Sequence, residues 1–401
     1  METDRRRWFP VAVAACAWAA CVSAAPEQPP AAGEVPQSTD LKSVLEPLRE
    51  KHKLPALAAA VVSVERVIAL GVVGERKEGS GVAAKHSDAF HLGSDTKAMT
   101  ATLIGMLVDD GKLSWTTTLS EVFPELASSM QPEFQTVTVE QLLMHRAGLS
   151  GRSWPKGVSF DEMHALPGSL KEQRLWAATK MLQEKPEHTP GKDFEYSNGG
   201  YLIAGAVAER VTGESWETLM QTRIFAPLNM KTAGFGSMGA PGTIDQPWQH
   251  RTTHLLGQYT SRKAIEPGPR SDNPPAMGPA GTVHCSLEDW ASFVRAHLDT
   301  TQEHFHLVKP ETLAKLHMPP PGGDYALGWL VTPRDWGGGN VLTHAGSNTQ
   351  NFAVVWVAPL KDFAVLVATN HYDDNGNTAR ACDEVAATLI GQFLLNKEGK
   401  T

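Results

Sequence analysis

Apolar residues follow two different periods along the chain. Continuous or alternating apolar runs predict strands, and they occur towards both ends, at 57–64, 67–73, 352–357 and 363–369. Apolar residues with helical spacing predict helices at 40–52, 98–107, 201–211 and about 378–395. Strands at both ends with helices between them indicate an α+β fold, in which one antiparallel sheet is assembled from the two termini and flanked by helices.

The middle of the chain is expected to be a mainly helical inserted region. We place this region at about 116–277 and the sheet subdomain at about 40–115 and 278–396, within one domain that covers 40–396. A cleft is expected between the sheet and the helical region. Residues 238–279 are rich in proline and glycine and predict a long loop that forms one wall of the cleft or a lid over it.

Residues 1–24 are predicted to be an export signal. Arg5-Arg6-Arg7 precedes an apolar, alanine-rich run from Trp8 to Val22, and Val22-Ser23-Ala24 fits a small-residue cleavage site. The run is too short to be a comfortable membrane span. Residues 25–39 then form a proline-rich polar tether with too little apolar content to fold alone.

The signal leaves the form of export open. Arg6-Arg7 followed by Phe9 is compatible with a twin-arginine route, and Val13-Ala14-Ala15-Cys16 resembles a bacterial lipoprotein cleavage box. A periplasmic or secreted protein and a membrane-anchored lipoprotein are therefore both retained as alternatives.

Net charge bears on the possible binding partners, and the cysteine positions bear on disulfide formation. The formal net charge of -8 and the pI near 6.0 give no support for binding to nucleic acid or to an anionic membrane. Cys16 and Cys21 lie in the predicted signal. Cys285 and Cys382 are expected to be two buried thiols, with a single disulfide as the alternative.

Ser94-Asp95-Thr96-Lys97 places a hydroxyl and an amine three residues apart at the start of the predicted 98–107 helix. Positions i and i+3 share one face of a helix, so the Lys97 amine can reach the Ser94 hydroxyl and accept its proton. The partial positive charge of a helix N-terminus also favours an alkoxide or oxyanion. Ser94 and Lys97 are the candidate nucleophile and base.

Tyr196-Ser197-Asn198 lies in a turn before the predicted 201–211 helix. A loop tyrosine can move protons if a nearby lysine lowers its pKa, and an asparagine amide can hold a substrate carbonyl. Tyr196 is therefore a candidate for proton transfer, and Asn198 for substrate binding. Each could instead be only a turn or cap residue.

His344-Ala345-Gly346-Ser347 precedes the predicted 352–357 strand and is expected at a strand start on the rim of the sheet. Gly346 would let substrate approach the backbone, and the Ser347 N–H could join the Ser94 N–H in an oxyanion hole. His344 is expected to contact substrate or to hydrogen-bond Tyr196; the alternative is that it only braces the strand edge.

Other matches and histidines carry less weight. Ser153-Trp154-Pro155-Lys156 repeats the Ser-x-x-Lys spacing in a Pro/Gly loop with no helix to aim the pair, and His91-Leu92-Gly93 repeats His-x-Gly. His145 is expected to be a hydrogen-bonded structural residue. His304-Phe305-His306 is expected to be a solvated pair rather than a metal site, because no acidic ligand follows at a useful spacing.

The three motifs in this order resemble the signatures of the serine β-lactamase and penicillin-binding protein superfamily, in its class C and D-aminopeptidase or esterase branch. Those signatures are Ser-x-x-Lys, Tyr-x-Asn, and Lys-Thr-Gly or His-x-Gly. The resemblance runs from about 45 to about 370. It includes 142–149 (LLMHRAGL), 190–198 (PGKDFEYSN), 224–230 (IFAPLNM), Ala280-Gly281-Thr282 and 325–329 (YALGW). It implies a β-lactamase-like fold with the architecture predicted above, and a site in which Asn198 helps to position Lys97.

His344 stands where typical β-lactamases carry lysine, so the site lacks one permanent positive charge that would attract a substrate carboxylate. Motifs and resemblance together predict an exported serine hydrolase that cleaves ester or small amide bonds through an acyl-enzyme on Ser94, with no cofactor and no metal. The expected partner is a small-molecule ester, amide or peptide. A D-amino-acid peptidase or β-lactamase using the same site is the alternative. From another class, the alternative is a catalytically silent cell-wall-binding protein.

Overall fold

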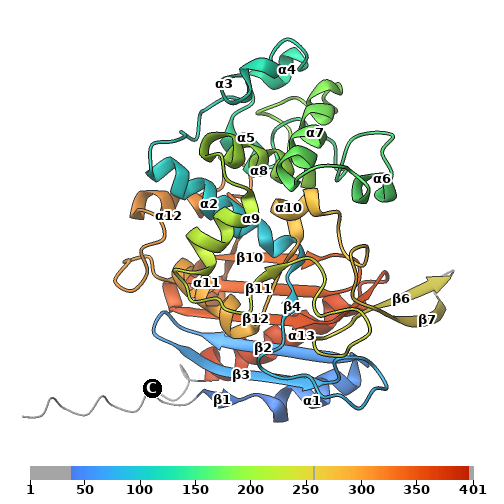
Figure 1. Cartoon of the computed structure of the whole chain (residues 1–401). Coiled ribbons are helices and arrows are strands. Elements are labelled where there is room, and N and C mark those ends of the chain that lie inside the picture. Colours follow the sequence, from blue (N-terminus) through green and yellow to red (C-terminus); the bar gives the residue numbers. More distant parts are fainter. Residues whose placement is uncertain (1–37, 256–257, 397–401) are drawn as a thin grey trace, which may run out of the picture. The chain divides into compact units, whose positions relative to one another are not determined.

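The computed structural model describes residues 38–255 and 258–396 (Figure 1). The predicted export signal, and the tether up to residue 37, lie outside the described residues. Among the described residues, we find no helix with the length and apolar character that a membrane crossing requires.

A seven-stranded sheet joins the two ends of the described chain (Figure 1). β2 pairs antiparallel with β12, so that Leu57 lies opposite Thr369 and Val62 opposite Ala364. The predicted sheet built from both ends is therefore confirmed. Its strands, in spatial order, are β1 (Thr39–Asp40), β3 (Val67–Gly74), β2 (Ala56–Val62), β12 (Phe363–Thr369), β11 (Phe352–Ala358), β10 (Gly339–Ser347) and β9 (Leu330–Arg334).

Both faces of this sheet are covered by helices. α1 (Lys42–Lys51) and α13 (Asn377–Ile390) pack on one face, in a core that includes Leu45, Val365 and Leu389. The other face carries α2 (Thr96–Asp109), α11 (Leu287–Leu298) and a larger apolar core. Burial on both sides explains why β2 and β12 read as continuous apolar runs rather than as alternating ones.

The middle region is mainly helical, as predicted, and its first helices, between residues 119 and 143, lie beyond α2 from the sheet (Figure 1). Four of its helices begin at a serine or threonine whose side chain caps the helix together with a Glu or Gln three residues later. Its helices are α3 (Leu119–Val122), α4 (Pro132–Gln135), α5 (Val139–Leu143), α6 (Phe160–His164), α7 (Leu170–Gln183), α8 (Asn198–Thr212) and α9 (Trp216–Met220).

The predicted long loop at 238–279 is only partly a loop. It contains a hairpin of β6 (Gln249–Leu255) and β7 (Gln258–Ile265), and β6 also pairs with β13 (His371–Asp373). The sequence of β6, QHRTTHL, has no alternating apolar face, and so the hairpin gave no strand signal.

Shorter elements complete the fold. A second small sheet contains β4 (Phe90–His91), β8 (Val283–Cys285) and β5 (Gly234–Phe235). α10 (Gly278–Gly281) and α12 (Pro310–Leu316) are short helices, and Gly391–Leu395 continues α13 as a π-helix. Cys285 on β8 and Cys382 on α13 are both buried and unpaired, which confirms the interpretation as two thiols.

Candidate active site

Ser94 lies in a single 3-10 turn, Gly93–Asp95, that leads directly into α2. Gly93 has a φ of +52°, a left-handed conformation that glycine adopts without strain. All residues of α2 from Thr96 to Leu107 are buried, which holds the helix and its side chains firmly in the core. The sequence prediction of a serine at a helix start is confirmed.

The Lys97 amine has three hydrogen-bond partners. Its Nζ lies 3.0 Å from Ser94 Oγ and 2.7 Å from Asn198 Oδ1. The third partner is the backbone carbonyl of Ala280, also at 2.7 Å. The predicted Ser94–Lys97 contact is therefore present, and Asn198 positions the amine as predicted.

The chemical nature of these partners determines where the amine can accept a proton. The Asn198 Oδ1 and the Ala280 carbonyl are acceptors only, so each must receive an N–H from Lys97. A neutral amine has two N–H groups, and its remaining lone pair then faces Ser94 Oγ. Burial lowers the pKa of Lys97 to about 7, although Asp95 acts to raise it. Near neutral pH, a substantial fraction of Lys97 is therefore in the form that can accept the Ser94 proton.

Tyr196 lies over the same amine, with the ring centroid 4.9 Å from Lys97 Nζ. Burial raises the pKa of Tyr196 well above its ordinary value, and a hydrogen bond with Ser94 only partly opposes this rise. The sequence-based idea that lysine lowers the Tyr196 pKa is therefore wrong for the free protein. Tyr196 is a neutral phenol that can pass a proton on but does not act as a phenolate base.

Asn198 is the first residue of α8, and its side chain makes contacts at both ends. While Oδ1 accepts from Lys97, Nδ2 donates to Ser153 Oγ at 2.9 Å. Ser153 belongs to the second Ser-x-x-Lys match, which sequence reasoning set aside because no helix aims it. In the structure its hydroxyl fixes the orientation of the Asn198 amide.

The turn before Ser94 and the end of β10 approach each other backbone to backbone. A Cβ added to Gly93 would lie 2.2 Å from the Ser347 backbone nitrogen, and one added to Gly346 would lie 2.6 Å from the Ser94 backbone nitrogen. Only glycine permits such an approach. The two predicted oxyanion-hole amides are thus brought together, at the end of β10 and not at the strand start that the sequence suggested.

His344 has partners that the sequence did not predict. Its Nδ1 donates to the Ala345 carbonyl at 2.9 Å, and its Nε2 accepts the Tyr325 hydroxyl at 2.9 Å. Burial, followed by the nearby Lys97 charge, lowers the pKa of His344 to about 3. The predicted hydrogen bond to Tyr196 is therefore replaced by one from Tyr325, and His344 is neutral at physiological pH.

Asp95 is a second residue that sequence reasoning missed. Its side chain is buried, and neither carboxyl oxygen has a hydrogen-bond partner within the described ranges. Its Oδ1 lies 3.9 Å from His344 Nδ1. Burial raises the pKa of Asp95 well above its ordinary value, while Lys97 acts in the opposite direction. Its place inside the Ser94–Lys97 motif was the only signal available from the sequence.

His145 is a structural neighbour of the site, as predicted. Its Nδ1 accepts the backbone N–H of Ser197 at 3.1 Å, and its ring lies 4.3 Å from that of Tyr196. His145 therefore supports the loop that carries Tyr196.

His304 contacts Glu65 at 2.8 Å, and no group of three or more His, Cys, Asp or Glu in the described part of the chain is arranged to hold a metal.

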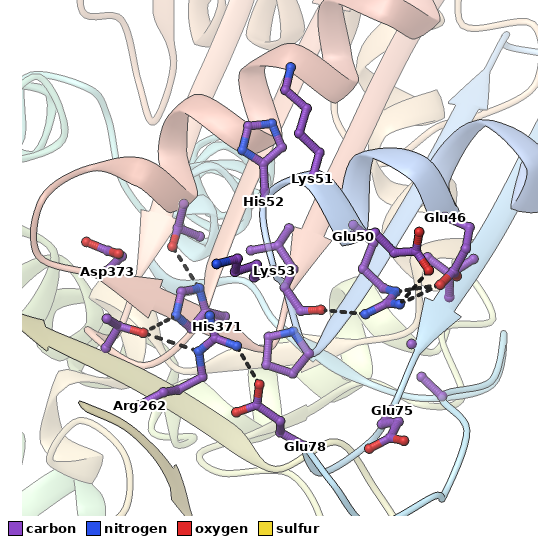
Figure 2. A pocket seen from close by; sticks show the side chains of 18 of the residues that line it. Glu46, Glu50, Lys51, His52, Lys53, Glu75, Glu78, Arg262, His371 and Asp373 are labelled. Atoms are coloured by element: carbon purple, nitrogen blue, oxygen red, sulfur yellow. Dashed lines mark hydrogen bonds and ion pairs between the residues drawn. The ribbon is translucent and has the colours of Figure 1, made fainter. Parts of the chain in front are cut away.

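A cavity of about 1580 Å³ lies elsewhere, against α1, α13 and the β6–β7 hairpin (Figure 2). Charged side chains of both signs line it, and several are already paired: Arg262 with Glu78, and His371 with Thr252 and Thr378. None of the predicted site residues lines this cavity. It is separate from the arrangement around Ser94.

Comparisons with known proteins show the family. The family model described as β-lactamase matches residues 41–389. Penicillin-binding protein 4 of Amycolatopsis lactamdurans is 28% identical over 338 residues, which cover 80% of this chain and 82% of that protein. Protein flp of Staphylococcus aureus (strain MW2) is 20% identical, over 82% of this chain and 62% of its own length.

Two solved structures share the fold. The octameric penicillin-binding protein homologue from Pyrococcus abyssi has a TM-score of 0.69 and 21% identity, covering 88% of this chain and 77% of the other. The D-alanine carboxypeptidase AmpC from Burkholderia cenocepacia has a TM-score of 0.63 and 18% identity, covering 87% and 98%. These neighbours confirm the predicted β-lactamase-like α+β fold.

Proposed function

Because the chain belongs to the β-lactamase family of serine hydrolases, we propose that it cleaves ester or small amide bonds through an acyl-enzyme on Ser94. The observation that carries this proposal is the set of partners around Lys97. Two of the three partners can only accept, so the lone pair of the neutral amine faces the Ser94 hydroxyl.

The proposed reaction has two halves. Lys97 takes the proton of Ser94 Oγ while this oxygen bonds to the substrate carbonyl carbon, whose oxygen becomes an oxyanion. The Ser94 and Ser347 backbone N–H groups stabilise that oxyanion, at roughly 3 kcal/mol for each donor. The leaving group departs with the proton from Lys97, passed on by the Tyr196 phenol. Water then repeats the attack on the acyl-enzyme and releases the acid and the free serine.

The proposed preference is for substrates without a carboxylate next to the scissile bond. His344 replaces the lysine of typical family members, and it is neutral and held by Tyr325. A neutral side chain gives no ion pair to a substrate carboxylate. This favours neutral esters and small amides over β-lactams and peptides that end in a free carboxylate.

A D-amino-acid peptidase activity is the second candidate, and one observation favours it. β9 pairs with β10 only from Gly339 to Thr343, and the exposed Ala345 lies beyond that pairing. A short backbone edge beside Ser94 suits an extended peptide that adds to the strand. The AmpC protein from Burkholderia cenocepacia, one of the solved structures that share the fold, is named a D-alanine carboxypeptidase.

Export is part of the proposal and rests on the sequence alone. The basic, apolar and small-residue segments of residues 1–24 fit a cleaved signal, and a lipid anchor at Cys16 is the alternative. Fractionation of the native host, followed by mass spectrometry of the mature N-terminus, separates these outcomes. A full-length N-terminus in the cytoplasmic fraction would contradict export.

The catalytic proposal is tested by labelling and by turnover. A fluorophosphonate should label the wild-type protein at Ser94, as mapped by mass spectrometry, and should not label Ser94→Ala. Short-chain nitrophenyl esters, a chromogenic cephalosporin and D-alanyl amides then rank the substrates. Equal turnover of every substrate by wild type and Ser94→Ala would show that Ser94 is not the nucleophile. Stoichiometric binding without labelling or turnover would favour the silent cell-wall-binding alternative.

A further inference from the structure

A second buried polar cluster lies next to Ser94, apart from the Lys97 contacts. It contains His91, Asp272 and Asn348, of which none is more than 5% exposed. His91 Nε2 lies 2.9 Å from Asp272 Oδ2, and Asn348 Nδ2 lies 2.7 Å from Asp272 Oδ1. The acyl-transfer steps proposed above assign no role to these side chains.

The hydrogen atoms of this cluster can be placed from its partners. The Gly93 backbone N–H donates to His91 Nδ1 at 3.0 Å, so the ring proton is on Nε2 and is donated to Asp272. Asn348 Oδ1 accepts the backbone N–H of Asn351 at 3.0 Å, which leaves Asn348 Nδ2 as the donor to Asp272. Both oxygens of Asp272 therefore act as acceptors.

The cluster connects the two segments that carry the proposed oxyanion-hole amides. One end of the connection is Gly93, which directly precedes Ser94, and the other is Asn348, which directly follows Ser347. The neighbouring Asn273 side chain donates to the Gly281 carbonyl at 2.9 Å, and a Cβ on Gly281 would lie 3.3 Å from Gly93. The segment around Asp272 is thus tied to the Ser94 turn at two points.

Asp272 is suited to such a connection because it is an ionised acceptor. Burial acts to raise the pKa of Asp272, but His91 and the hydrogen bonds from its neighbours outweigh burial and keep this pKa below its ordinary value. Hydrogen bonds to an ionised acceptor are stronger than those between neutral groups.

We propose that Asp272 is a positioning residue: by holding His91 and Asn348 at the same time, it sets the spacing between the Ser94 and Ser347 backbone amides. This inference rests on the proposed acyl-transfer function, in which those amides form the oxyanion hole. In the sequence, His91-Leu92-Gly93 was only a second match to His-x-Gly. In the structure, His91 accepts the Gly93 N–H and so holds the turn that carries Ser94.

Asp272→Asn tests this role without changing the size of the side chain. The new NH₂ group must face either Asn348 Nδ2 or His91 Nε2–H, and both are donors. If His91 changes tautomer so that Nε2 can accept from the new NH₂ group, its ring proton moves to Nδ1. Nδ1 can then no longer accept the Gly93 N–H, and two N–H groups face each other. Either arrangement disturbs one of the two segments that carry the oxyanion donors.

Asp299→Asn is the matched control. Asp299 is also buried, and its carboxylate accepts the backbone N–H groups of His304 and Phe305 at 2.8 Å, remote from the cluster. Both variants should lower the melting temperature. A merely structural role for Asp272 would give the two variants the same kinetic behaviour.

The readouts are kcat and KM for a nitrophenyl ester, and the inhibition constant of phenylboronic acid, whose tetrahedral adduct on serine imitates the oxyanion. For Asp272→Asn we expect kcat to fall by about tenfold to a hundredfold with little change in KM, and boronate binding to weaken by a similar factor. Asp299→Asn should keep wild-type kcat and boronate binding. A folded Asp272→Asn protein with wild-type values for both would overturn the inference.

Two His91 variants keep the test decisive if Asp272→Asn does not fold. His91→Gln can still donate to Asp272 but loses the acceptor for Gly93, and His91→Asn does the reverse. Both should show the same selective loss of kcat, and unchanged kcat in both would overturn the inference. If the wild-type protein neither reacts with the fluorophosphonate nor turns over an ester, the proposed function itself fails, and the role of Asp272 fails with it.

Discussion

The first and third motifs each bring one buried basic side chain towards Ser94, and the two differ in what they can do. Burial lowers the pKa of both, of Lys97 to about 7 and of His344 to about 3. Both are neutral above neutral pH. Lys97 nevertheless directs its lone pair at a hydroxyl that can react, whereas the free nitrogen of His344 is occupied by the Tyr325 hydroxyl.

Burial alone therefore does not make a basic side chain a catalytic base. The carbonyl of Ala280 and the amide oxygen of Asn198 take the N–H groups of Lys97 and so leave its lone pair free for Ser94. For His344 the reverse holds: the Tyr325 hydroxyl donates to Nε2, so the lone pair of this nitrogen is not available to Ser94. The partners of a basic group, more than its pKa, decide whether it can take part in proton transfer.

The largest effect should come from removing the amine on the active side of this comparison. Lys97→Met keeps the length and burial of the side chain but has no lone pair on nitrogen, and we expect kcat/KM for a nitrophenyl ester to fall by about a thousandfold. Lys156→Met, at the exposed lysine of the second Ser-x-x-Lys match, should retain wild-type activity. General-base catalysis contributes at least about a hundredfold. A Lys97→Met protein that keeps more than about a tenth of wild-type activity would therefore show that another group takes the proton.

Acidification should produce the next largest effect. In the proposed reaction neutral Lys97 is the active form, and its pKa is about 7, so kcat/KM should rise with pH through about 7 and should be about a hundredfold lower at pH 5 than on the plateau. His344, with a pKa of about 3, contributes no inflection in this range. His344→Gln should therefore leave the inflection in place, and its disappearance in that variant would assign it to the histidine.

Asn198→Asp would place a carboxylate where an amide oxygen now accepts from Lys97. An adjacent negative charge favours the ammonium form, so the pKa of Lys97 should rise by about one to three units. At pH 7 the activity should then fall by about fivefold or more and should recover towards pH 9. Ser153→Ala removes only the other contact of Asn198 and should shift the pH profile little; an equal shift in both variants would argue against a charge effect.

Tyr325→Phe should have the smallest effect on activity and a measurable effect on stability. It leaves the buried His344 Nε2 without a donor, at a cost of about 1–3 kcal/mol in the free energy of unfolding. We expect kcat/KM to stay within about threefold of wild type, because His344 is assigned no proton transfer. Urea unfolding of Tyr325→Phe and of the half-buried control Tyr372→Phe measures the loss of stability. Ester hydrolysis measures the change in kcat/KM. A large loss of activity at unchanged stability would place His344 among the catalytic groups.

Structure could be predicted from the sequence wherever a pattern is local and strong. The apolar runs of β2, β3, β11 and β12 predicted the sheet, and the spacing of Ser94 and Lys97 predicted their contact. The polar hairpin β6–β7 was missed, because its strands have no apolar face and β6 pairs with the distant β13. Export remains a prediction.

The site could be predicted only as far as its motifs extend. Lys97 and Asn198 are 101 residues apart, and only the resemblance to a family brought them together before the structure did. The contacts of Ser153, Tyr325 and Asp95 depend on how distant segments pack, so that no residue type or spacing announces them. The same is true of Asp272, which lies in a segment that the sequence presented as a loop.

The pairing of β2 with β12 has a consequence for how the protein is made. The hydrogen bond from the Thr369 hydroxyl to the Ala56 carbonyl joins residues 313 positions apart, so the middle of the sheet cannot close until residue 369 has left the ribosome. Ser94 is synthesised early, yet Ser347 arrives late. A nascent or truncated chain that stops before Ser347 therefore holds the proposed nucleophile without its second amide, and the proposed hydrolysis has to wait until both segments are in place.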